Sequence, residues 1–521
     1  QFPKQRFCPV QRMASATIRG VPTASSSTVD RAPLLQWERA MKERVDAGLL
    51  PGYCSCVINK GEVAHVSEYG YADLEHGRPF TKDSIVRIYC ITKTIVAVGI
   101  LILFERGMLK LTDMVSKYIP AFKRVCVVKC GSAISVPGPY LPSVAAKFTI
   151  LRLLTHTAGV GYASDFANKA TDPHTKMYEP LLGAIDKGEI ASLERYVEKL
   201  AQLPLRFQPG KTLKYAMGHD ILARIIEIVS GMSLDSFLKK EIFEPLGMND
   251  TSFFVPQQKA SRLAALYGNR ERAERMAKRF GKWPKVLPRG KHALCRIDGD
   301  KPSESNWFEG NQCKVLSGNG ILGSNTGGLV STLADQARFF TMLLNGGVLN
   351  KNRILKETTL QEWAFENLLP LPGSRGKHRR TGCGWTGWSA LGERGMKRTK
   401  TDPKARFDDY EEGEVAMGGA ANTYWSVNPV RDQVTLWFSQ ALDSDSWGGD
   451  RTTKAGVDKP SPDNFTAAAR LVAPRRADEA LARRKRLASE IQGGETSTKR
   501  DAKRLRIPTP NGQAFVPVSR Q

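Results

Sequence analysis

A run of apolar residues from Ile91 to Glu105 constrains the fold of this chain more than any other stretch. The run is apolar on nearly every side of a helix and is followed by Gly107, a residue type that commonly ends helices. We therefore predict a helix over Ile91–Glu105 that is buried nearly all round and lies at the centre of its domain. Its longest apolar part, Ile95 to Phe104, is too short to span a bilayer, so no transmembrane segment is expected.

Cys90 and Lys93 stand at the start of this apolar run, three residues apart. Residues with this spacing share a helix face, so the Lys93 amine is expected to reach the Cys90 sulfur. If Cys90 opens the helix, the backbone N–H groups and the helix dipole favour a thiolate there. Lys93 has to be paired or neutral, because its helix is buried. Taken alone the pattern is weak, and a buried cysteine near a surface lysine is the competing interpretation.

The net charge of +25 is concentrated in four stretches of the chain. Residues 259–292 carry +9, residues 375–406 carry +8, residues 475–521 carry +7 and residues 1–31 carry +4, which leaves the remainder close to neutral. This distribution is typical of an enzyme fold with basic insertions and basic ends, and it argues against a dedicated nucleic-acid-binding domain. The basic stretches are candidate contact sites for an acidic partner.

The nine cysteines form an odd set without the spacing of a disulfide framework. We therefore expect a reducing, intracellular compartment. Cys54 and Cys56 are two residues apart and are expected to share one face of a strand. Cys126 and Cys130 have no matching Cys or His pair nearby, so no metal site is predicted.

Both ends of the chain have the composition of segments outside a folded domain. Residues 1–31 are rich in Ser, Thr and Arg; from Met13, a candidate start, this leader resembles an organellar transit peptide, and a plain disordered leader fits equally well. Residues 446–521 form a basic tail with little apolar content, which we expect to be mostly disordered. The clusters Arg483–Arg486 and Lys499 to Arg504 match a bipartite nuclear signal, with a solvated tail as the alternative.

The order of expected elements predicts an α+β fold. Tyr53–Asn59 and Val63–Tyr71 are predicted as a strand pair, and Glu414–Ala416, Thr423–Asn428 and Gln433–Gln440 as three more strands joined by short turns. Strands from both ends of the chain then form one mainly antiparallel sheet flanked by helices, with the middle inserted as a helical lobe. Besides the central helix, the expected helices cover Leu34–Ala47, Ile221–Val229, Leu234–Phe243 and Leu333–Leu344.

Several stretches, in order along the chain, together resemble the serine β-lactamase-like superfamily. The branch they resemble holds class C-type esterases, acyltransferases and penicillin-binding-protein-like members. The resemblance covers roughly residues 35–440. It implies a β-lactamase/transpeptidase-like domain over residues 32–445, with basic insertions at about 259–315 and 370–412. The matching stretches are Phe80–Cys90, Glu105–Gly107, Val115–Pro120, Leu154–Gly159, Gly210–Gly231, Glu244–Met248, Gly327–Thr332 and Met342–Gly347.

The resemblance implies acyl transfer through a covalent intermediate. Cys90 stands at the position of the family's nucleophilic serine, Lys93 at that of its lysine, and Tyr215 at that of the tyrosine that moves protons. A cationic lysine within ~4–6 Å lowers the pKa of a thiol. A Cys90 thiolate beside a Lys93 ammonium is therefore a self-consistent resting pair, with Tyr215 as the proton donor to the leaving group.

Two further elements depart from the family's pattern. Met217 stands where the family has an asparagine, and Met417 stands where a lysine, histidine or tryptophan usually precedes two glycines. Gly418, Gly419 and Ala420 keep the small residues that let a substrate approach the strand. The resemblance implies an oxyanion hole made by the backbone N–H groups of the nucleophile and of Ala420.

Four residues near these motifs receive structural interpretations. His156 is expected to make structural hydrogen bonds, and Asp113 to anchor the turn after the central helix. His219 is interpreted as a helix-start or surface histidine, with a place near the cleft as the alternative. Trp388 is expected to pack against the Gly-rich turn at 382–387, with lining of the cleft as the alternative.

Two functions stay open on this basis. The first is a hydrolase or acyltransferase that acts on small esters or thioesters through an acyl-enzyme at Cys90 and needs no cofactor. Amides and β-lactams suit it less, because Met217 and Met417 replace the polar side chains of the family's site, so a strict β-lactamase is disfavoured. The second is a catalytically degraded member, a pseudoenzyme, that serves as a binding or scaffold protein and contacts an acidic partner through its basic insertions and tail.

Overall fold

A computed structural model describes much of the first of the two units into which the chain divides, residues 1–474 and 475–521. Most of the predicted insertions and all of the predicted tail except Ala469 lie outside the described residues, so those domain boundaries stay predictions. The described residues are 17–23, 32–128, 142–162, 176–270, 273–274, 294–299, 309, 315–320, 328–369, 386–395, 411–442 and 469.

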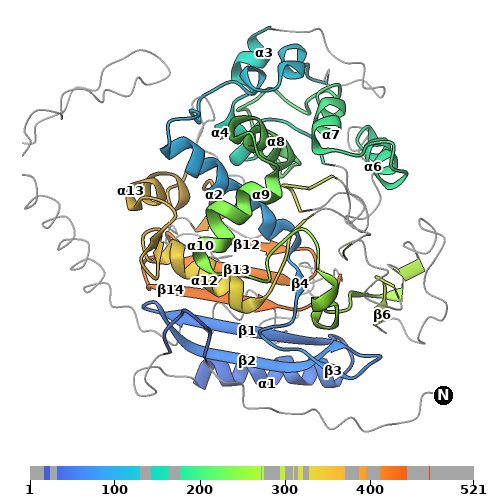
Figure 1. The fold of residues 1–521 in the computed structure, drawn as a ribbon, viewed down its shortest axis with the longest axis vertical. Coiled ribbons are helices and arrows are strands. Elements are labelled where there is room, and N and C mark those ends of the chain that lie inside the picture. The colour runs from blue at the N-terminus through green and yellow to red at the C-terminus, as the bar shows by residue number, and fades with distance from the viewer. Residues whose placement is uncertain are drawn as a thin grey trace, which may run out of the picture. The chain divides into compact units, whose positions relative to one another are not determined.

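An antiparallel sheet of eight strands joins the two ends of this unit, in the order β10-β11-β12-β13-β14-β1-β2-β3 (Figure 1). The early strand β1 pairs with the late strand β14, with Cys56 opposite Leu436. The expected α+β fold with a mainly antiparallel sheet is confirmed. The strands are β1 Gly52–Asn59, β2 Glu62–Asp73, β3 Arg78–Pro79, β10 Thr386–Trp388, β11 Glu393–Gly395, β12 Val415–Gly419, β13 Thr423–Asn428 and β14 Gln433–Phe438.

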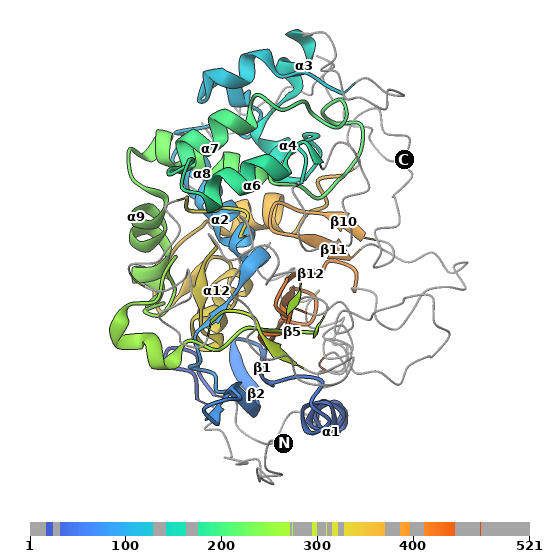
Figure 2. The ribbon, with the colours of Figure 1, turned by 90° about the vertical axis from the view of Figure 1, so that its right-hand side faces the viewer.

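Helices cover both faces of this sheet (Figures 1 and 2). On one face, helix α1 (Ala32–Asp46) packs Trp37 edge-on against Tyr53 of β1, with 5.7 Å between ring centroids. On the other face, α12 (Leu333–Leu344) stacks Phe340 on Trp425 of β13 at 4.5 Å. Side chains alternate along β1 between these two layers, and Cys54 and Cys56 share the α12 side as predicted.

The central helix predicted from the apolar run is α2, Thr92–Glu105, preceded by a 3-10 turn at Tyr89–Ile91. Every residue of α2 up to Leu103 is buried, and Gly107 follows the helix in the left-handed conformation with a φ of 72°. Its Gly99 faces side chains of α8 and α9, where a Cβ would lie 3.0 Å from Ile226. The helix therefore connects the sheet layer to the helical lobe.

The helical lobe gathers around α8, which packs on both α2 and α4 (Figure 2). The expected helix over Leu234–Phe243 is in fact two segments, α9 and a π-helical turn at Lys239–Phe243. The lobe comprises α3 Pro142–Lys147, α4 Ile150–Leu154, α6 Glu179–Asp186, α7 Leu193–Leu200, α8 Gly218–Ser230 and α9 Leu234–Leu238. The remaining short helices are α10 Glu244–Leu246 and α13 Glu357–Thr359, the latter followed by a π-helical turn at Leu360–Ala364. Further 3-10 turns lie at Val115–Lys117, Pro120–Arg124 and Gln257–Arg262. The two-stranded pairs are β4 Val86–Arg87 with β7 Val330–Ser331, β5 Tyr267–Gly268 with β6 Cys295–Arg296, and β8 Val348–Leu349 with β9 Asn352–Arg353.

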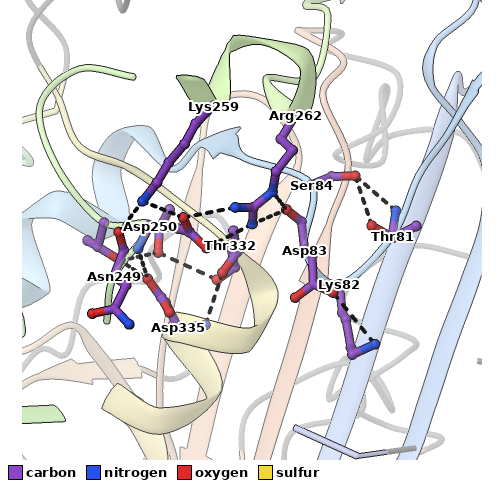
Figure 3. Close-up of polar contacts among 12 residues, drawn as sticks. Thr81, Lys82, Asp83, Ser84, Asn249, Asp250, Lys259, Arg262, Thr332 and Asp335 are labelled. Carbon is purple, nitrogen blue, oxygen red and sulfur yellow. Dashed lines mark hydrogen bonds and ion pairs between the residues drawn. The ribbon is translucent and has the colours of Figure 1, made fainter. Parts of the chain in front are cut away.

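A polar cluster around Asp250 fixes the segment that leads into the Cys90 turn (Figure 3). The Asp250 carboxylate pairs with Arg262 and Lys259, each at 2.8 Å. Arg262 also donates to the backbone carbonyl of Asp83 at 2.7 Å, just before β4. The Asp335 carboxylate at the start of α12 accepts the Asp250 backbone N–H at 2.8 Å. These bonds tie three separate chain segments together.

Part of the predicted leader contacts this folded unit. Within residues 17–23, Ile18 and Val21 are buried, and the carbonyl of Pro22 accepts the N–H of Val63 at 2.7 Å. Arg338 of α12 donates to the Arg19 carbonyl at 2.5 Å. Whether residues 1–31 act as a targeting leader stays a prediction. No helix among the described residues has both the length and the apolar character needed to cross a membrane.

Candidate active site

The Cys90 turn has a backbone geometry that sets it apart from an ordinary helix start. Tyr89, the residue before Cys90, has a φ of 45°, which is rare for a side chain of this size. Gly320 packs on this turn so closely that a Cβ there would lie 2.0 Å from the Tyr89 carbonyl oxygen. Cys90 itself is 7 % exposed. Strain of this kind, held by surrounding structure, is typical of functional sites.

Lys93 lies in the first turn of α2, three residues after Cys90, and is completely buried. Its ammonium donates to the carbonyl of Asn319 at 2.5 Å and lies 4.6 Å from the centre of the Tyr215 ring. Burial lowers the pKa of Lys93, while the Cys90 thiolate and the Asp220 carboxylate oppose that shift. A hydrogen bond to Cys90 also raises the Lys93 pKa, so the two side chains are within hydrogen-bonding reach.

Tyr215 approaches the same sulfur from the lobe. Burial raises the pKa of Tyr215 well above its usual range, and the charge of Cys90, the neighbouring Tyr162 and a hydrogen bond to Cys90 act in the same direction. The phenol is therefore neutral and holds a proton at neutral pH. Lys93 and Tyr215 are thus both within reach of the Cys90 sulfur, and the catalytic role of these three side chains stays a prediction.

The end of β12 lies directly against the Cys90 turn. A Cβ on Gly419 would lie 2.4 Å from the Ile88 carbonyl and 2.2 Å from the Thr423 hydroxyl, so only glycine fits there. Met417, on the same strand, is buried, and Ala420 is half-buried beside it. The expected strand with its Gly418-Gly419 pair is thus next to Cys90, and its role as an oxyanion hole stays a prediction.

Met217 is buried and not exposed at the surface of the site. Its side chain is 1 % exposed, and its sulfur accepts a hydrogen bond from the Tyr196 hydroxyl at 3.7 Å. It stands at the start of α8, two residues after Tyr215. A direct role for Met217 in binding substrate stays a prediction.

An aromatic cluster surrounds Tyr215, and sequence reasoning found only part of it. His156 lies 4.6 Å from the Tyr215 ring, 5.0 Å from Trp388 and 5.1 Å from His219 between ring centroids. Its Nδ1 accepts the backbone N–H of Ala216 at 3.1 Å, which is the structural role expected for it. Trp388 therefore packs against the site residues, and its indole donates to a carbonyl of α4.

Of the two positions predicted for His219, the helix start is observed and the surface position is wrong. It does stand in the first turn of α8, but it is buried, not at the surface. Burial lowers the pKa of both His219 and His156 well below the usual range, and the charge of Lys93 acts in the same direction. Both imidazoles are therefore neutral, and neither adds a positive charge to the site.

Asp113 has the anchoring role predicted for it. Its carboxylate accepts the backbone N–H of Lys110 at 3.0 Å, the Lys117 ammonium at 2.8 Å and the Tyr118 hydroxyl at 2.5 Å. It closes the turn after α2, away from Cys90.

Asp220 and Asn319 were missed by sequence reasoning. Asp220 is an acid in the first turn of a helix, where it resembles an ordinary helix-start residue. Asn319 is 226 residues from Lys93 in the chain, and no local pattern connects the two.

A cavity of about 280 Å³ beside Phe243, Asp250 and Lys259 includes none of the residues that contact Cys90.

Comparison with known proteins agrees with the architecture described above. The chain is 27% identical to protein Rv1367c of Mycobacterium tuberculosis over 408 residues, which cover 77% of this chain and 89% of that protein. It is 30% identical to the esterase EstB of Burkholderia gladioli over 313 residues, 58% of this chain and 72% of the esterase. A lovastatin esterase of Penicillium rubens is 28% identical over 217 residues, 40% of this chain and 50% of that enzyme.

Solved structures show the same fold at low sequence identity. EstCE1, a hydrolase with promiscuous acyltransferase activity, matches with a TM-score of 0.59 and 19% identity over 84% of this chain and 99% of its own. Simvastatin synthase LovD of Aspergillus terreus matches with a TM-score of 0.59 and 18% identity over 84% of this chain and 97% of its own. The family model described as Beta-lactamase matches residues 37–458. The chain therefore belongs to the beta-lactamase family.

Proposed function

We propose that this protein is a hydrolase or acyltransferase that acts on small esters or thioesters through an acyl-enzyme at Cys90. The observation that carries the proposal is the meeting of two proton-carrying side chains, Lys93 and Tyr215, at the Cys90 sulfur. A thiol with a base and an acid in reach is the minimum set for nucleophilic acyl transfer.

The reaction follows from these three groups. Lys93 holds the Cys90 proton as an ammonium, and the thiolate sulfur bonds to the ester carbonyl carbon while the carbonyl electrons move to oxygen. The intermediate collapses with cleavage of the bond to the leaving alcohol, which takes a proton from Tyr215, and Lys93 returns a proton to Tyr215. Water, or a second alcohol, then attacks the thioester with the proton movements reversed, and the Cys90 thiolate is restored beside the Lys93 ammonium.

The surroundings of the trio favour a neutral substrate with an apolar body. Trp388 and Tyr162 pack on Tyr215, with ring centroids 6.2 Å and 5.8 Å away, and Met417 lies on the adjoining strand. Both histidines of the cluster are neutral. The names of the relatives, an esterase, a lovastatin esterase and an acyltransferase-active hydrolase, support the same substrate class.

Covalent labelling of the full chain tests this function. Incubation with p-nitrophenyl esters of short and medium acyl chains is expected to release nitrophenol and to leave an acyl mass on the Cys90 peptide. Cys90→Ala is expected to abolish both signals, whereas Cys126→Ala, which removes a half-buried free cysteine elsewhere, is expected to leave them unchanged. Turnover that survives Cys90→Ala, or no adduct with any ester of the panel, would overturn the proposal.

One observation favours the alternative of a binding protein without catalysis. Met217 and Met417 are apolar where family members carry polar side chains, and the basic stretches at residues 259–292, 375–406 and 475–521 carry +24. A binding role of this electrostatic kind predicts that affinity for polyglutamate falls steeply with salt. Salt-independent binding, or none, removes this alternative.

A further inference from the structure

Asp220 holds a buried carboxylate that the reaction described above does not use. Its Oδ1 accepts the Ser317 hydroxyl at 2.8 Å and the Asn319 backbone N–H at 2.9 Å. Its Oδ2 has no hydrogen-bond partner among the described residues, and the side chain is fully buried. Burying a carboxylate is costly, so its presence calls for an explanation.

The segment that Asp220 holds contacts both halves of the catalytic pair. The Asn319 carbonyl accepts the Lys93 ammonium, and Gly320 packs against the Tyr89 carbonyl just before Cys90. On the other side, Gly318 packs on the backbone of α8, where a Cβ would lie 2.3 Å from the His219 carbonyl. The segment 317–320 is therefore wedged between α8 and the Cys90 turn, and Asp220 is the side chain that anchors it.

The charge of Asp220 also reaches Lys93 through space. The Asp220 carboxylate raises the pKa of Lys93, and only burial and the Cys90 thiolate have larger effects on that pKa. Lys93 in turn lowers the pKa of Asp220, although burial raises that pKa overall to about 7. Asp220 is thus a counter-charge available to Lys93 near neutral pH.

We propose that Asp220 is a positioning residue for the Cys90–Lys93 pair, because it anchors the segment that accepts the Lys93 ammonium and supplies the negative charge that keeps Lys93 protonated. The proposal rests on the function proposed above. Asp220 itself touches neither Cys90 nor substrate in this role. It acts on Cys90 through Lys93, since a protonated Lys93 stabilises the thiolate.

Several other titratable groups face this pair and have to be considered in any titration. Tyr162 and Tyr215 stay neutral because their pKa values are raised by burial, and His156 and His219 stay neutral because theirs are lowered by burial. Tyr196, from α7, also has a pKa raised by burial. The Asp220 carboxylate raises the pKa of Lys93, and the pKa of Asp220 itself is about 7.

The pH dependence of Cys90 alkylation tests the proposal without relying on catalysis. The full-length chain is reacted with iodoacetamide between pH 5.5 and 10, and the rate is read from the mass of the Cys90 peptide. Asp220→Asn keeps an oxygen that accepts the Ser317 and Asn319 bonds but removes the charge. Lys93 then loses its proton more easily, so we expect alkylation at pH 7 to fall at least tenfold and the profile to move to higher pH.

Two further variants separate the charge from a merely structural role. Ser317→Ala removes one hydrogen bond to the carboxylate but leaves its charge, so Asp220 ionises less readily and the profile moves in the same direction by a smaller amount; this variant decides the matter if Asp220→Asn does not fold. Asp235→Asn, which neutralises a half-buried acid on α9 outside the site, is the matched control and is expected to leave the profile unchanged.

The outcomes distinguish this proposal from the proposed function. Alkylation profiles of Asp220→Asn and Ser317→Ala that coincide with wild type, or faster alkylation at pH 7, overturn the role of Asp220, even where the wild-type protein still forms the acyl adduct. A shifted profile in a protein that forms no acyl adduct keeps the role of Asp220 and refutes the proposed acyl transfer instead.

Discussion

Replacing Lys93 by methionine is expected to separate stability from activity at this site. Methionine has a similar length and fills the same buried space, but it carries no proton and no charge. The change removes the ammonium that donates to the Asn319 carbonyl and that faces Cys90. Activity and stability should therefore respond very differently.

The effect on stability follows from opposing contributions of similar size. Leaving the Asn319 carbonyl without its donor costs about 1–3 kcal/mol. Replacing a whole buried ion pair by apolar side chains is neutral or stabilises by about 1–4 kcal/mol, whereas removing one partner costs about 3–5 kcal/mol where the other stays charged. Asp220 is not left as a stranded anion, because its pKa of about 7 lets the carboxyl take up a proton. The melting temperature should therefore change by no more than a few degrees.

The effect on activity has no such compensation. Loss of a general base typically lowers rates by about 10²–10⁴-fold. We expect Lys93→Met to form the acyl adduct at Cys90 at least a hundredfold more slowly, as followed by intact mass and by release of nitrophenol. Lys187→Met, at a side chain that is 73% exposed, is the control and should match wild type in both assays. Acylation at the wild-type rate in Lys93→Met would refute the assignment of Lys93 as the base.

Three other outcomes are expected. Gly419→Ala forces a Cβ to within 2.4 Å of the Ile88 carbonyl, so it should lower the stability by at least about 1–3 kcal/mol and suppress acylation. Gly183→Ala in α6 has open space around it and should raise the stability by about 0.5–1 kcal/mol. Thermal unfolding measures the stability of both variants. Burial raises the pKa of Asp335 to about 6 in the folded protein, against about 4 in the unfolded chain. The stability that Asp335 contributes is therefore fully present below about pH 4 and is lost as the pH rises through about 6. Asp335→Asn should remove this pH dependence, which amounts to about 3 kcal/mol of unfolding free energy measured in urea at each pH. Ile18→Ala should destabilise by about 2–4 kcal/mol if residues 17–23 belong to the folded unit, and an unchanged melting temperature would contradict that contact.

The parts of the fold that the sequence predicted are those whose patterns are local. The strands at β1, β2, β13 and β14 alternate or run apolar between clear turns, and the helix α12 was predicted with its observed bounds. The helix over Leu234–Phe243 was predicted as continuous, but a π-helical turn follows Leu238, and no residue in that stretch announces the change. Local pattern gives the element and not its internal irregularity.

The polar interior of the site was less accessible to sequence reasoning. Cys90, Lys93 and Tyr215 were found because they lie within recognisable motifs. Asp220 and the segment it holds come together only in the fold, since Asp220 and Asn319 are 99 residues apart. Burial is what turns an apparent helix-start acid into a member of the site, and the sequence around Asp220 gives no sign of how much of the chain covers it.

The arrangement of charge explains why the cysteine–lysine pair cannot be treated alone. Lys93 is the cation that faces both Cys90 and Asp220, while the nearby imidazoles and phenols stay neutral. The Asp220 carboxylate raises the pKa of Lys93 and Lys93 lowers that of Asp220, so the titrations of these two groups are linked. The thiolate proposed at Cys90 therefore depends on a charged Lys93, and the Asp220 carboxylate favours that charge.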